Sequence, residues 1–297
     1  MYPYYVSGFA YAECSWVVSI VKDIEYKTGW RIAFSFSIGL HAKDRALLSS
    51  IQTYFGVGSI RTRKSDNSSH YSVQSIKDLK NVIIPHFDKY PLLSQKRADF
   101  QLFKLIIDLV NKKEHLTVEG LTKIVSIRAS MNLGLSDKLK AAFPFVIPVA
   151  KPIMQLPESI DPQFVLGFSE GESCFDINIV QSKTHKIGFQ ISNRFRISQH
   201  SRDRALLALI SKHLKCGTLQ PYKHMVNLTI VSLKDIIKII IPFFDKYHLK
   251  GVKQLDYACF RQVAFLMEKK LHLTREGLEQ IQKIKAEMNK GRNHDES

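Results

Sequence analysis

The sequence lacks the features of a membrane-spanning or disulfide-stapled protein. A transmembrane helix needs about 20 consecutive, mostly apolar residues, and no such run occurs in the 297 residues. The first residues show neither the charged start and apolar core of a secretory signal nor the composition of an organelle import signal. We therefore expect no membrane partner.

Cysteine is scarce and is not arranged for metal binding. The four cysteines show no CxxC spacing, which disfavours a zinc site and a disulfide framework. A reducing intracellular compartment is the simpler expectation. Cys14 and Cys174 have no histidine beside them in the sequence, so packing is favoured over nucleophilic chemistry.

Negative charge is in short supply. The chain has 43 Lys and Arg against 27 Asp and Glu, a formal net charge of +16 and a pI near 9.6. Such an excess favours a polyanionic partner: DNA, RNA or an anionic membrane surface. A basic protein without such a partner remains the alternative from charge alone.

The chain is internally duplicated. Residues 6–14 (VSGFAYAEC) return as residues 165–173 (VLGFSEGES). Three more blocks recur in the same order: 41–48 at 200–207, 84–90 at 241–247, and 115–121 at 272–278. The repeat is much longer than the 20–45 residues of a solenoid unit, so it predicts two domains.

Proline marks the boundary between the repeats. Five of the ten prolines lie between Pro144 and Pro162, which is typical of a linker. We predict an N-terminal domain over residues 1–143, a linker over residues 144–162 and a C-terminal domain over residues 163–297.

Each repeat predicts an α+β fold. Alternating apolar and polar residues predict strands, and longer periodic segments predict helices. In the first repeat we expect strands at 15–21, 31–38, 58–63 and 71–74 after the motif helix, and further helices at 43–55, 76–86, 94–111 and 117–131. The order indicates a four-stranded antiparallel sheet with helices on one face and solvent on the other.

The solvent-facing side of each sheet is predicted to be polar and basic. Arg reads guanine in the DNA major groove, Asn and Gln read adenine, and Ser and Thr read either. A solvated sheet face is polar in any protein, so DNA binding is favoured only together with the net charge and the acidic pair described next. The candidate DNA-binding residues are Ser15, Ser19, Arg31, Ser35, Ser37, Ser59, Arg61, Arg63, Ser72 and Gln74 in the first repeat, and Asp176, Asn178, Gln190, Arg194, Arg196, Ser198, Thr218, Gln220, Tyr222 and Asn227 in the second.

Both motif copies end in a glutamate, Glu13 or Glu172. Small residues four apart in each motif allow two helix backbones to approach closely. If the two turns pack together, the carboxylates repel unless a cation lies between them. Mg²⁺ prefers such oxygen ligands and retains several waters.

Segments 8–13 and 167–172 resemble the two motifs of single-chain LAGLIDADG homing endonucleases, most closely the fungal mitochondrial, intron-encoded type. The resemblance covers nearly the whole chain. It implies a monomer of two pseudo-symmetric αββαββα domains whose antiparallel sheets form a saddle over about 20 base pairs of double-stranded DNA. It also implies a site-specific double-strand break made by Mg²⁺-dependent phosphodiester hydrolysis.

The resemblance assigns the metal site to the end of each motif. It implies that Glu13 and Glu172, beside Ala12 and Gly171, hold Mg²⁺ and that each half cuts one strand. Ca²⁺ can occupy such a site without supporting cleavage.

Three further catalytic residues follow from the resemblance. Lys96 and Lys253 match basic residues that assist cleavage, with a surface lysine as the alternative. Gln199 matches a glutamine that orders a water, whereas Leu40 stands there in the first repeat. The two strands are therefore not expected to be cut at equal rates.

His41 and His200 are candidates for a general base, because histidine often accepts a proton in catalysis. Both precede a helix within a repeated block, so capping or core packing is favoured.

Two other functions remain open from the sequence. One is an RNA maturase that helps a host intron splice, and the other is a catalytically inactive DNA-binding module. The retained glutamate pair favours the nuclease, and the resemblance implies a mitochondrial, organelle-encoded protein.

Overall fold

The computed structural model describes residues 1–288, so the last nine residues of the predicted C-terminal domain lie outside it. Contacts divide the chain into two compact units. The first comprises Met1 and residues 13–156, and the second comprises residues 2–12 and the chain from Pro157 onward. Among the described residues no helix is long and apolar enough to cross a membrane.

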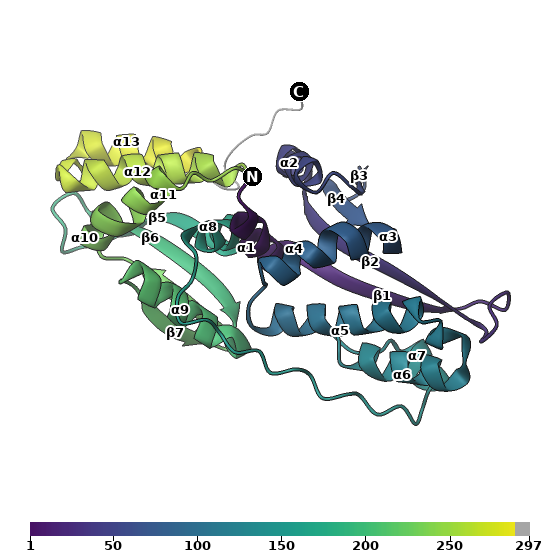
Figure 1. Cartoon of the computed structure of the whole chain (residues 1–297). Helices are drawn as coiled ribbons and strands as arrows, with labels where there is room; N and C mark the ends of the chain where they lie inside the picture. Colours follow the sequence, from purple (N-terminus) through teal and green to yellow (C-terminus); the bar gives the residue numbers. More distant parts are fainter. Residues whose placement is uncertain (289–297) are drawn as a thin grey trace. The chain divides into compact units, whose positions relative to one another are not determined.

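The first unit contains one four-stranded antiparallel sheet in the order β1-β2-β4-β3 (Figure 1). Helices α4 and α5 run along this sheet in Figure 1. Its main elements are β1 (Cys14–Lys22), β2 (Trp30–His41), α2 (Arg45–Phe55), β3 (Ser59–Arg63), β4 (Ser68–Val73), α3 (Ile76–Asp78), α4 (Ile84–Lys89), α5 (Ser94–Asn111), α6 (Val118–Ala129) and α7 (Asp137–Ala142).

The second unit repeats this arrangement with the order β5-β6-β8-β7. The expected α+β fold is confirmed, and the helices and strands follow one another along each repeat in the expected order. Its main elements are α8 (Pro162–Glu172), β5 (Ser173–Gln181), β6 (Phe189–His200), α9 (Arg204–Leu214), β7 (Thr218–Tyr222), β8 (Met225–Ile230), α10 (Leu233–Asp235), α11 (Ile241–Lys246), α12 (Lys253–Glu268) and α13 (Arg275–Ala286).

Period-two patterning separates the two faces of each sheet. In β1 the residues alternate between buried and more exposed positions, beginning with buried Cys14 and exposed Ser15. Trp16 is fully buried and its ring contacts Phe36, Phe87, Phe100 and Phe103. Aromatic burial of this size dominates core energetics, and it leaves the opposite sheet face to solvent.

A wide helical turn precedes Pro85 in the first unit and Pro242 in the second. In each unit a five-residue π-helical turn, Leu79–Ile83 or Ile236–Ile240, leads into the helix that carries the proline near its start. Proline cannot donate to the helix ladder and its ring clashes with the carbonyl four residues earlier. The wider turn accommodates that ring, and the predicted helix over 76–86 is therefore composite and extends to Lys89.

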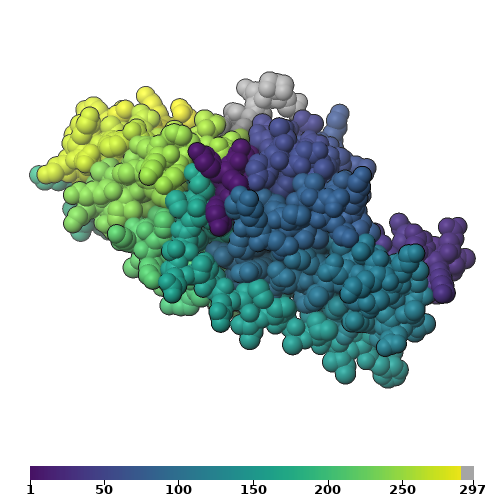
Figure 2. All heavy atoms as spheres, in the orientation of Figure 1, coloured from purple at the N-terminus to yellow at the C-terminus, as the bar shows by residue number. Residues whose placement is uncertain are grey.

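Helix α1 (Pro3–Glu13) packs against α8 within the second unit. A Cβ added at Gly8 would overlap the carbonyl oxygen of Phe164, and one added at Gly167 would overlap that of Tyr5. The expected close packing of the two motif helices through small residues is therefore present. In Figure 2 the dark purple start of the chain lies against the green-to-yellow surface of this unit.

Candidate nucleic-acid interface and catalytic residues

The ten polar residues predicted for the second sheet all lie on the strand positions opposite the core and are exposed or half-buried. The face is internally ordered by hydrogen bonds. Arg194 Nη2 donates to Asp176 Oδ2 at 2.6 Å, and the Ser198 hydroxyl donates to Asn227 Oδ1 at 2.6 Å. These two cross-strand hydrogen bonds therefore fix the orientation of the four side chains before any ligand binds.

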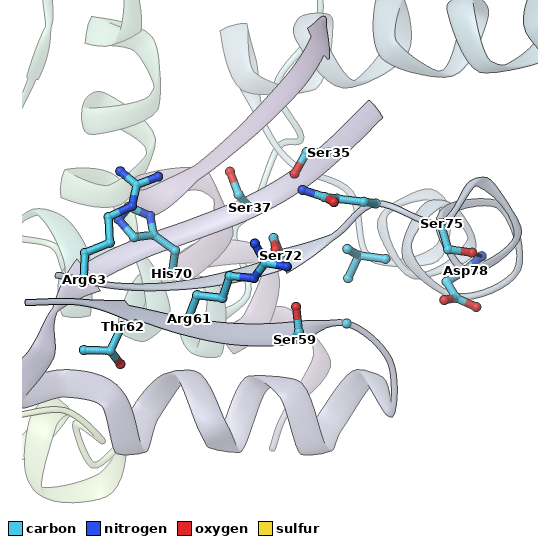
Figure 3. A pocket seen from close by; sticks show the side chains of 13 residues that line it. Ser35, Ser37, Ser59, Arg61, Thr62, Arg63, His70, Ser72, Ser75 and Asp78 are labelled. Atoms are coloured by element: carbon cyan, nitrogen blue, oxygen red, sulfur yellow. Dashed lines mark hydrogen bonds between the residues drawn. The ribbon is translucent and has the colours of Figure 1, made fainter. Parts of the chain in front are cut away.

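The corresponding face of the first unit forms a groove of about 560 Å³. Figure 3 shows Arg61 and Arg63 extending from β3 over this face, with Ser35 and Ser37 on β2, while Thr62 points away from them. The groove combines short hydroxyl side chains with guanidinium groups, which suits contacts to phosphates and base edges.

Sequence reasoning missed His70, which also lines this groove. Its ring lies over Gly39 on the neighbouring strand, where an added Cβ would come within 2.8 Å of Nδ1. Its Nε2 is 2.9 Å from the Ser68 hydroxyl. The strand was expected to start at residue 71, whereas β4 starts at Ser68, and extending the alternation backward would have found this histidine.

Sequence reasoning also missed short side chains on the second sheet face, for a similar reason. The period of two also places Cys174, Ser192 and Thr229 on this face, and Thr229 is opposite Arg196 in the register. Their side chains are short, so they add little reach to the surface.

The two motif glutamates each occupy the last position of their helix, Glu13 in α1 and Glu172 in α8, and both are half-buried. The last four carbonyls of a helix have no intrahelical partner, and the helix dipole adds partial negative charge there. A carboxylate at this position makes the local electrostatic potential more negative, so each helix end attracts cations.

The positively charged ammonium group of Lys253 lies at the C-terminal end of α8. Its Nζ donates to the carbonyl oxygens of Ser169, Gly171 and Ser173 at 3.1, 3.0 and 2.6 Å. These carbonyls surround Glu172 in the sequence, and charge-assisted hydrogen bonds of this kind are the strong ones. Lys253 is half-buried rather than a free surface lysine.

Lys96 makes the equivalent contact in the first unit with fewer partners. Its Nζ donates to the carbonyl oxygen of Cys14, the residue after Glu13, at 2.6 Å. The thiol of Cys14 is buried, which raises its pKa to about 12. The packing role expected for Cys14 fits this burial, because a thiol is a nucleophile only as the thiolate.

Glu170 fixes the loop that leads to Lys253. Its carboxylate accepts hydrogen bonds from the backbone N–H groups of Lys250 (2.6 Å) and Gly251 (3.1 Å) and from the Tyr5 hydroxyl (3.0 Å). Burial raises the pKa of this carboxyl, and the three donors act in the opposite direction. The equivalent Tyr11 packs against the rings of Phe164 and Phe168 in α8.

Gln199 lies on the core side of its strand, whereas the two repeated histidines cap short helical turns. Gln199 follows Phe195 and Ile197 on the core side of β6, half-buried near the strand end. His41 and His200 accept through Nδ1 from the backbone N–H groups of Lys43 and Arg202 at 3.3 and 3.2 Å. The expected capping role of the histidines is confirmed.

The donor chemistry of the motif ends fits a hard divalent cation. The candidate ligands are all oxygens: the carboxylates of Glu13 and Glu172 and the carbonyls of Ala12 and Gly171. In the described part of the chain no three or more His, Cys, Asp and Glu residues cluster into a metal site.

Comparisons with known proteins agree with these observations. The chain is 42% identical over 283 residues to "Probable intron-encoded endonuclease 3" of Neurospora crassa, covering 94% of this chain and 53% of that protein. The chain thus spans about half the length of this curated relative.

Solved structures match over 98% of the chain. The I-LtrWI LAGLIDADG homing endonuclease bound to target DNA superposes with a TM-score of 0.96 at 40% identity, covering 98% of each chain. I-SmaMI bound to an uncleaved DNA target in the presence of calcium ions gives a TM-score of 0.95 at 39% identity, covering 98% of this chain and 99% of that one. The profile of the family described as "LAGLIDADG endonuclease" matches residues 6–107 and 165–264. The chain therefore belongs to the LAGLIDADG endonuclease family.

Proposed function

We propose that this protein is a site-specific homing endonuclease that makes a double-strand break in a target of about 20 base pairs. The observation that carries the proposal is the repeated arrangement at the motif ends. In each repeat a helix ends in a glutamate, and a lysine binds the backbone beside it. The DNA-bound relatives at about 40% identity support the same conclusion.

Glu13 and Glu172 are proposed to hold Mg²⁺, together with the carbonyls of Ala12 and Gly171. When bound, Mg²⁺ would neutralise the scissile phosphate and lower the pKa of a bound water. Lys96 and Lys253, fixed by their backbone contacts, would supply positive charge near the phosphate. Gln199 is proposed to orient a water in the second half only, because Leu40 has no hydrogen-bonding group.

The polar sheet faces are proposed to bind double-stranded DNA as a saddle formed by one chain, in a mitochondrial setting. The calcium-containing relative supports Ca²⁺ as a non-cleaving occupant of the site. No feature of the described residues favours RNA over DNA, so a maturase function is not proposed. The direct test is linearisation of a plasmid that carries the native intron-insertion sequence, with Mg²⁺ and without it.

Salt should weaken DNA binding steeply. Each phosphate contact releases condensed counterions, so six to ten contacts reduce affinity by about 10³ to 10⁵ between 50 and 200 mM salt. The net charge of +16 can supply such contacts. Fluorescence anisotropy with Ca²⁺ in place of Mg²⁺ measures this dependence, and a flat response would contradict the proposed binding surface.

Replacing Lys253 should impair cleavage more than replacing Lys96. Lys253→Met removes three contacts to carbonyls around Glu172, whereas Lys96→Met removes one. We expect about a hundredfold slower strand cleavage for Lys253→Met, a size typical of losing one stabilising donor, and a smaller loss for Lys96→Met. Strand-specific nicking assays measure both rates.

Lys104→Met provides the control for this comparison. Lys104 pairs with Asp88 on the surface of the first unit, so its loss should leave both cleavage rates unchanged. Equal rates for wild type and Lys253→Met would show that this lysine has no part in cleavage.

A further inference from the structure

One acidic side chain, Asp176, stands among the ten residues predicted for the DNA-binding face of the second sheet. A carboxylate that faces a polyanion is repelled by it, and like-charge juxtaposition disfavours an interface. We therefore expect Asp176 to have a role on this basic face that offsets its repulsion of a polyanion.

Asp176 forms an ion pair directly across the sheet. It lies opposite Arg194 in the β5–β6 register, with 2.6 Å between Arg194 Nη2 and Asp176 Oδ2. The side chains are 39% and 31% exposed for Arg194 and Asp176. Partial shielding from water strengthens such a pair relative to a fully exposed one.

This contact determines which donors of Arg194 remain for a ligand. The guanidinium carries five N–H donors in a rigid plane. Its Nε is buried and has no hydrogen-bond partner among the described residues, and one Nη2 hydrogen points to Asp176. Three Nη hydrogens remain for a ligand, and donation from an arginine side chain to O6 and N7 of guanine is the commonest specific base contact in the major groove.

The first sheet lacks this arrangement. Val17 and Ser35 occupy the same paired positions in the β1–β2 register, and neither side chain carries charge. The ion pair is therefore a feature of one half of the duplicated protein and not of the shared fold.

We propose that Asp176 is a positioning residue that holds Arg194 ready to read one guanine in the half-site facing the second sheet. Pre-organisation lowers the rotamer entropy that Arg194 loses on binding, and it restricts the guanidinium to one direction of approach. The proposal rests on the proposed DNA-binding function.

The test measures base discrimination by the full chain with Ca²⁺, so that no cleavage occurs. A target is first selected from a randomised library, and each base pair of the relevant half-site is then replaced in turn. For the wild type we expect one G·C pair whose replacement weakens binding at least tenfold. Arg194→Ala should remove that discrimination, and Asp176→Asn should reduce it to less than threefold.

Further variants separate positioning from direct contact. Asp176→Glu should restore part of the discrimination, and Val17→Asn, the control at the equivalent position, should leave it unchanged. In an Arg194→Ala background, Asp176→Asn should have no further effect on base preference. A shift in cytosine preference in that background would show that Asp176 reads a base itself and would overturn the proposal.

Two further results separate failure of the positioning role from failure of the proposed DNA-binding function. Selective wild-type binding with unchanged discrimination in Asp176→Asn would overturn the positioning role and leave the proposed function intact. Wild-type binding that is insensitive to every base pair would overturn both.

Discussion

Glu13→Gln and Glu172→Gln should each reduce double-strand cleavage by about a thousandfold while target binding persists. An amide keeps the size of the side chain but loses the negative charge that holds a divalent cation, and a thousandfold loss corresponds to about 4 kcal/mol of the activation barrier. Each glutamate is proposed to serve one strand. Cleavage of a supercoiled plasmid, resolved into nicked and linear products, measures the effect.

Glu119→Gln and Glu276→Gln are matched controls for these variants. Both glutamates are exposed in the first turn of equivalent helices, α6 and α13. They should leave cleavage unchanged. Retained linearisation by both motif variants would refute the metal assignment, and loss of DNA binding would point instead to a structural role.

Gly8→Ala and Gly167→Ala should destabilise the protein, although alanine normally favours a helix over glycine by about 1 kcal/mol. An added Cβ would overlap a backbone carbonyl of the opposite helix at both positions. A backbone cannot move aside as a side chain can, so we expect a loss of about 3 kcal/mol, the upper end of the usual cost of overpacking. Chemical denaturation followed by circular dichroism measures the change.

Gly188→Ala is the control for the helix contact. An added Cβ at Gly188 meets nothing within 4 Å, and its φ of +77° makes alanine costly only through backbone strain, about 1 kcal/mol. A denaturation midpoint that rises in Gly8→Ala would contradict the close packing of α1 against α8.

The repeated blocks allowed much of the fold to be predicted from the sequence. Alternation identified both faces of each sheet, because a period of two directly reports which side chains are buried. The small residues Gly8 and Gly167 predicted a close helix contact, and the structure contains it. The ends of the strands were predicted less accurately. Strand β4 begins at Ser68, earlier than expected, and His70 was missed as a result.

The contacts of the candidate site depended on long-range geometry. Lys253 was selected by resemblance, but its three carbonyl partners lie 80 to 84 residues away in the sequence. Similarly, the repeat places α1 in the first domain by sequence, whereas residues 2–12, which include all of α1 except Glu13, belong to the second unit. Spacing in a sequence identifies small or acidic positions, but it does not determine which distant backbone they meet.

The most direct measurement is a crystal structure of this protein with its DNA target and Ca²⁺. We predict ion density within about 2.3–2.6 Å of carboxylate oxygens of both Glu13 and Glu172, with phosphate oxygens of the cleavage site on the same ions. Carboxylates that contact no ion, or that face away from the bound nucleic acid, would contradict the account.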